Sequence, residues 1–86
     1  MAQNSGRRLR SRRPPPLQAL ELRVPGGGAM VEAVRWELFI HPDVRDVLAT
    51  DRPDVVLVIH RGEPQPSRWL ETLRSAGYDV MPGAGA

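Results

Sequence analysis

The chain has 86 residues, with nine prolines, eight glycines, no cysteine and a net charge of +2. This length allows one small domain, and the lack of cysteine excludes a disulfide framework, a thiolate metal site and a cysteine nucleophile. No apolar segment approaches the roughly 18 residues of a membrane span, and the early arginines are followed by prolines rather than by an apolar signal sequence, so we expect a cytoplasmic protein without a membrane partner.

Charge divides the chain into two unlike parts. Residues 1–29 hold six arginines against one glutamate, a net charge of +5, while residues 30–86 hold six arginines against nine acidic residues, a net charge of −3. The first part has few apolar residues and a proline triplet, which predicts a disordered tail with a short strand at 20–24. Its arginines are candidate nucleic-acid contacts. The alternative is a solvated tail that has no function. These candidates are Arg7, Arg8, Arg10, Arg12 and Arg13.

A second hypothesis concerns the start of the native protein. All basic residues are arginine, which indicates a GC-rich genome, and three glycines at 26–28 lie just before Met30. Glycine codons begin with GG, and a purine-rich run before a start codon resembles a bacterial ribosome-binding site. We therefore hypothesise that Met30 is the native start and that residues 1–29 lie outside the native protein.

The segment VRWELFIH, residues 34–41, alternates apolar and polar side chains. A period of two predicts a strand with one buried face. A helix is the alternative, because the apolar residues from Met30 to Leu38 also fit helical spacing.

The next segment, PDVRDVLATDRP, predicts a short helix. Pro42 suits a first helical position, two aspartates favour the positive end of the helix dipole, and Pro53 prevents continuation. Its apolar stripe consists of Val44, Val47 and Leu48.

Five apolar residues in a row, Val55 to Ile59, follow this helix. A run that is apolar on both faces is typical of a parallel strand covered by helices on either side. We expect it to be the most buried segment.

The segment EPQPSRWLETLRSAGYDV predicts a loop and then a second helix. Ser67 is the expected N-cap, and Gly77 suits the left-handed position after the helix. The apolar stripe of this helix consists of Trp69, Leu70, Leu73 and Ala76. A last short strand is expected from Tyr78 to Met81, and the remaining residues are expected to fray.

The predicted order is strand, helix, strand, helix, strand. With right-handed crossovers, this order gives an α/β fold, a small three-stranded, mostly parallel β-α-β-α-β sheet of the Rossmann-like or receiver-like kind, over residues 30–82. The stretches RPDVVLV and LETLRSAGYDV resemble the middle of bacterial response-regulator receiver domains. In that family a phospho-accepting aspartate follows the apolar run, where this chain has Ile59 and His60. Phosphotransfer is therefore not expected.

The two histidines are the candidate chemical groups. His41 ends the first predicted strand and His60 ends the second, so a parallel sheet would place both at one edge, where ligands bind. They are the candidate catalytic residues, and an anion site is expected from His60, Arg61, Gly62, Glu63 and Asp43. The alternative is that these residues are ordinary strand ends that meet solvent. Two histidines supply too few ligands for a typical metal site, so no metal site is expected. No cofactor is expected either.

Both tryptophans, Trp36 and Trp69, lie on apolar stripes, which predicts core packing, with a dimer or partner surface as the alternative for one ring. A body this small has a thin core. We therefore expect an interaction module that binds itself, a partner protein or a small anion. The alternatives are a nucleic-acid binder that uses the tail arginines and a small hydrolase or metal-dependent enzyme that uses the histidines.

Overall fold

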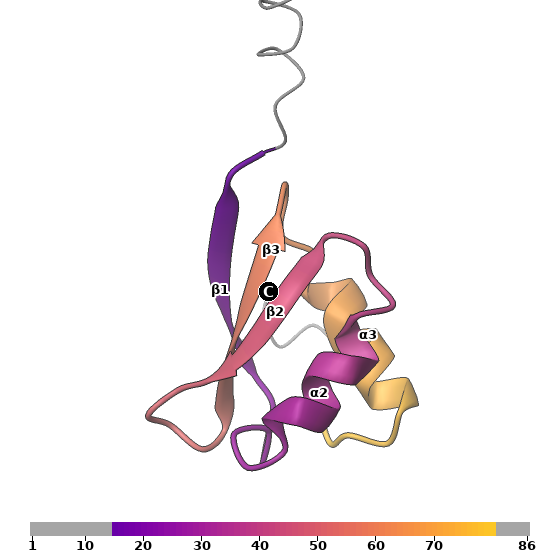
Figure 1. Ribbon diagram of the computed structural model, residues 1–86. Helices are drawn as coiled ribbons and strands as arrows, with labels where there is room; N and C mark the ends of the chain where they lie inside the picture. Colours follow the sequence, from indigo (N-terminus) through magenta and orange to yellow (C-terminus); the bar gives the residue numbers. More distant parts are fainter. Residues whose placement is uncertain (1–14, 81–86) are drawn as a thin grey trace, which may run out of the picture.

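The computed structural model describes residues 15–80. In chain order, this part forms β1 (Leu17–Arg23), α2 (Val31–Leu38), β2 (Val44–Ala49), β3 (Val55–Arg61) and α3 (Pro66–Ser75). The strands form one sheet in the order β1-β3-β2, and both pairings are antiparallel. Both helices lie on one side of this sheet (Figure 1). The predicted parallel β-α-β-α-β sheet is therefore wrong, because the fold is a small antiparallel sheet with two helices.

The strand predicted at residues 34–41 is instead the helix α2. Val34 and Leu38 are four residues apart, a spacing that suits one face of a strand and one face of a helix equally. Both side chains are fully buried, whereas Trp36 is 71% exposed and Ile40 is 74% exposed. An alternating strand would have buried all four. The helical alternative is correct.

The helix predicted after Pro42 is instead the strand β2. Its pairing with β3 shifts register between Val44 and Asp46, so one extra residue bulges out of the ladder. The bulge returns Val44 and Val47 to the same, buried face of the sheet. Apolar residues three apart imitate a helical stripe, and this irregularity explains the error.

The apolar run at residues 55–59 is confirmed as a strand, the central strand β3. Val56, Val58 and His60 point toward the helices and are buried. Leu57 and Ile59 point to the opposite face and are half-buried. The expected helical cover on both faces is wrong, since both helices pack on the same face.

The edge strand β1 comes from the segment that the sequence predicts to be largely disordered. The short strand expected at 20–24 is found, and it runs over Leu17–Arg23. Leu22 and Val24 are buried in the core, so a chain that began at Met30 would lack an edge strand and part of the core. The tail arginines at positions 7 to 13 lie outside the described residues.

The helix α3 agrees with the expectation in most respects. Trp69, Leu70 and Leu73 are buried, and Gly77 adopts a φ of +99° after the helix, a left-handed conformation that favours glycine. Ser67 is not the N-cap, because the helix begins at Pro66.

Residues 78–80 do not form the expected last strand. They follow α3 as irregular chain, and Val80 packs into the core with 5% exposure. Met81, the last residue of that predicted strand, lies outside the described residues. Neither helix within residues 15–80 has the length and apolar character needed to cross a membrane.

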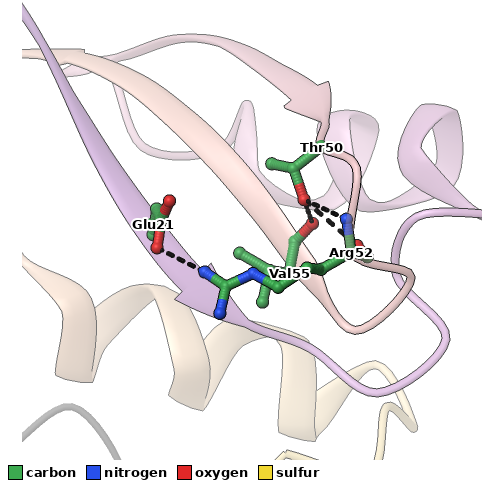
Figure 2. A network of polar contacts seen from close by, with 4 residues as sticks. All are labelled: Glu21, Thr50, Arg52 and Val55. Atoms are coloured by element: carbon green, nitrogen blue, oxygen red, sulfur yellow. Dashed lines mark hydrogen bonds and ion pairs between the residues drawn. The ribbon is translucent and has the colours of Figure 1, made fainter.

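A polar network closes the turn between β2 and β3 and fastens it to β1 (Figure 2). The Thr50 hydroxyl donates to the Val55 carbonyl over 2.9 Å and accepts the Arg52 N–H over 3.0 Å. The Arg52 guanidinium also pairs with Glu21 of β1 over 2.7 Å. The turn therefore contacts all three strands of the sheet.

The difference between the two faces of β3 is testable with one polar substitution on each. Val58→Asn buries an amide away from water and should lower the free energy of unfolding by about 3 kcal/mol or more. Ile59→Asn keeps its amide in contact with water and should cost about 1 kcal/mol. Urea unfolding followed by circular dichroism measures both. Equal costs would mean that the second face is also covered.

Candidate functional site

The predicted site residues converge at one end of the sheet, where β2 begins and β3 ends. Val44 lies opposite His60 in the ladder, and the Arg61 N–H donates to the Asp43 carbonyl over 2.9 Å. This convergence results from antiparallel pairing and not from neighbouring ends of parallel strands. It joins the backbones of these residues, while their side chains point in different directions.

His60 is a core residue. Its side chain is 1% exposed, and its ring lies 5.2 Å from that of Trp69, between centroids. His60 Nδ1 and Trp69 Nε1 are both buried, with no hydrogen-bond partner among the described residues. A ring in this position contacts neither solvent nor the surface that a substrate would reach.

Arg61 points to the opposite face of β3, because side chains alternate along a strand. Its guanidinium donates to the Pro15 carbonyl over 2.8 Å, next to the start of β1. Gly62 then turns the chain with a φ of +75°, and Glu63 is exposed. The histidine and the arginine that were expected to share an anion therefore lie on opposite faces of the sheet.

His41 lies beside α3, and its Nε2 is 2.7 Å from the Thr72 hydroxyl oxygen. The ring borders a shallow groove of about 360 Å³. The other residues that line this groove all come from α3, and they are Ser67, Arg68, Glu71 and Thr72. Burial lowers the pKa of His41 below 6.5; Asp43 raises this pKa, and Arg68 lowers it further.

A neutral imidazole at hydrogen-bond distance from a hydroxyl can accept its proton. Activation of a nucleophile also needs a third group to orient the imidazole. Within residues 15–80, Nε2 is the only atom of the His41 ring with a hydrogen-bond partner. The same part of the chain contains no cluster of histidine and acidic residues that could hold a metal ion. The contact therefore serves chiefly to fasten the loop after α2 to α3.

An apolar surface that was not predicted from the sequence lies at the end of α2. We call Trp36, Phe39 and Ile40 the α2 surface; their exposed fractions are 71%, 39% and 74%. The rings of Trp36 and Phe39 meet edge to face, with centroids 5.6 Å apart. Trp69 is the tryptophan in the core, as expected, and Trp36 follows the alternative of a surface ring. The alternative prediction of a helix at residues 34–41 could have indicated this surface, because a helix places Trp36 and Ile40 opposite the buried pair Val34 and Leu38.

Comparison of the chain with family models, with curated protein sequences and with solved structures gives no match. The inference of function therefore depends on the surfaces of the molecule.

Two substitutions test whether His60 is a structural residue. His60→Ala removes a packed ring and should lower the free energy of unfolding by about 2–4 kcal/mol. His60→Leu keeps an apolar side chain of similar size and removes a buried nitrogen without a protein partner, so its stability should stay within about 1 kcal/mol of the parent. Chemical denaturation measures both. A large loss with leucine would show that the imidazole nitrogens contribute to folding.

The free energy of unfolding should decrease at low pH, because His41 becomes protonated. Because its pKa is lowered in the folded state, the folded form prefers the neutral ring; this contribution is present above pH 6.5 and is lost as the pH falls through the lower folded value. His41→Gln, which does not titrate, should reduce the loss in unfolding free energy between about pH 8 and about pH 5. Urea titrations of the parent and of the His41→Gln variant measure this difference. The two proteins differ only at residue 41, so the difference reports on that residue. An identical pH dependence would contradict the assignment to His41.

Proposed function

We propose that the protein is a small protein-binding module and that it binds its partner through the α2 surface. The observation that carries this proposal is the exposure of Trp36 and Ile40, two large apolar side chains on one helix end. Tryptophan is enriched among residues that dominate binding energy, and adjoining apolar side chains exposed to water often mark an interaction site.

The α2 surface is held on a rigid support. Arg35, one residue before Trp36, donates through Nη2 to the Val47 carbonyl over 2.9 Å and pairs with Asp46 over 2.9 Å. These contacts fasten α2 to β2, and Phe39 packs against the Trp36 ring. Little conformational freedom is then lost on binding, which favours affinity.

The charges of α2 indicate the chemistry of the partner. Glu32 and Glu37 are exposed, while the arginine of this helix is engaged by Asp46. A complementary protein would offer an apolar pocket for the tryptophan, surrounded by basic residues. The lack of cysteine in the chain supports a cytoplasmic location for this binding.

The alternative functions have less support. A hydrolase would need His41 and His60 to act together, and His60 is buried against Trp69. Nucleic-acid binding would use the arginines at 7 to 13, which lie outside the described residues. An anion site at residues 60–63 would need side chains that converge, and those of His60 and Arg61 diverge.

A photo-reactive phenylalanine analogue in place of Trp36 should crosslink a partner in the producing cell. The matched control places the analogue at Asp51, an exposed position in the turn between β2 and β3. Mass spectrometry should identify a protein trapped at position 36 and not at position 51. With that protein purified, Ile40→Ser should weaken binding by more than about tenfold, because the complex loses an apolar side chain that would be buried on binding.

Two outcomes would contradict the proposal. The same proteins crosslinked at both positions would show non-specific capture. Unchanged affinity of the Ile40→Ser protein for the purified partner would show that binding uses another surface.

A further inference from the structure

We propose that the outer edge of β1 pairs with β1 of a second copy of this chain, forming a two-fold symmetric dimer with a continuous six-stranded sheet. This inference concerns a surface separate from the α2 surface. It follows from the different state of the two edges of the sheet and from the sequence of β1.

The edge formed by β2 is closed at its centre by side chains of its own chain. The Val47 N–H donates to Asp46 Oδ1 over 2.8 Å, and the Val47 carbonyl accepts from Arg35 Nη2 over 2.9 Å. Arg35 and Asp46 also pair with each other. Another strand could not form hydrogen bonds here without breaking these contacts, and such blocking is a common protection of edge strands.

The edge formed by β1 has no such protection from residues 15–80. Residues of an antiparallel strand point their N–H and C=O groups alternately toward and away from the paired strand. The Val24 N–H donates to the Asp54 carbonyl, so the even-numbered residues of β1 face β3. The outward residues are Leu17, Ala19, Glu21 and Arg23. Among the described residues, no hydrogen bond engages the backbone N–H and C=O groups of these four.

The sequence of β1 is complementary to itself about Leu20. A two-fold axis at Leu20 places Leu17 opposite Arg23 of the second copy and Ala19 opposite Glu21. Every outward residue then meets an outward residue, so the hydrogen-bond ladder covers the whole strand. The two Leu20 side chains meet at the axis on the covered face, where each already packs against its own core.

The neighbouring registers are less favourable. An axis at Glu21 places two carboxylates directly opposite each other, which is destabilising. Axes at Ala19 and at Leu22 bring Pro15 and Pro25, respectively, into the ladder, and proline has no N–H to donate.

Charge does not oppose the pairing at Leu20. The strand carries one glutamate and one arginine, so its net charge is zero. Glu21 is also neutralised within its own chain by Arg52 (Figure 2). Seven residues from each copy are fewer than the roughly 20–30 per partner that a stable complex of standard size buries. We therefore expect a reversible dimer.

The first experiment measures self-association of the full chain by analytical ultracentrifugation. Ala19→Pro removes an outward N–H without removing a hydrogen bond to β3, and it should weaken dimerisation by more than about tenfold. Ala19→Thr, which keeps the N–H, should dimerise like the parent, and circular dichroism should show both variants folded. A parent chain that stays monomeric, or an Ala19→Pro variant that dimerises normally, would overturn the proposal.

The second experiment tests the register and does not depend on the proline variant. The chain has no cysteine, so Leu20→Cys introduces a single thiol on the proposed axis. Facing residues there have Cα atoms about 4.5 Å apart, within disulfide range, so mild oxidation should give a covalent dimer. Gln18→Cys is the control, because its two copies would lie about 13 Å apart along the strands. Equal crosslinking of both variants, or none of Leu20→Cys, would overturn this pairing.

The two proposals can fail separately. A dimer that is lost in Ile40→Ser but survives in Ala19→Pro would form through the α2 surface, which overturns pairing at β1 and leaves protein binding intact. In cells, the Leu20→Cys chain could instead form a disulfide with a different protein and not with its own copy. That result would show that the β1 edge pairs with a strand of another protein, which also overturns self-pairing.

Discussion

The pairing of β3 with a strand on each side is the interaction on which the rest of the structure depends. β1 and β2 satisfy the backbone of β3 from both directions, and the alternation of β3 side chains then decides what each face contains. Val56, Val58 and His60 meet the helices, while Leu57 and Ile59 remain on the open face. Two short helices cover one face of the sheet, so a strand that is apolar on both sides keeps its second face only half-buried.

Local signals in the sequence predict some elements well and mislead for others. β3 and α3 follow from an uninterrupted apolar run and from a stripe that ends at a glycine with positive φ. α2 was mistaken for a strand because Val34 and Leu38 fit both periods, and only their tertiary partners decide between them. β2 was mistaken for a helix because a bulge restores the burial of residues three apart. A bulge is invisible in the sequence until the pairing register is known.

The candidate site shows the same limit in another form. Its residues do meet at one end of the sheet, yet the direction of each side chain depends on the face that the register assigns to it. Consecutive side chains of a strand point to opposite faces, and this separates buried His60 from Arg61. A change of register by one residue would exchange the two faces. Composition indicates which groups can do chemistry. The register decides whether they can act together, and in this chain it separates them.

The two proposed surfaces lie at opposite edges of the molecule, and this arrangement links them. α2 packs against β2, the edge strand farthest from β1 in the sheet order (Figure 1). Arg35 both closes the β2 edge and supports the neighbouring Trp36, so the contact that blocks pairing at one edge also stabilises the surface proposed for binding. A dimer through β1 would leave both copies of the α2 surface free. Two weak sites in one assembly bind a two-sited partner more tightly than either site alone, because the second contact becomes intramolecular.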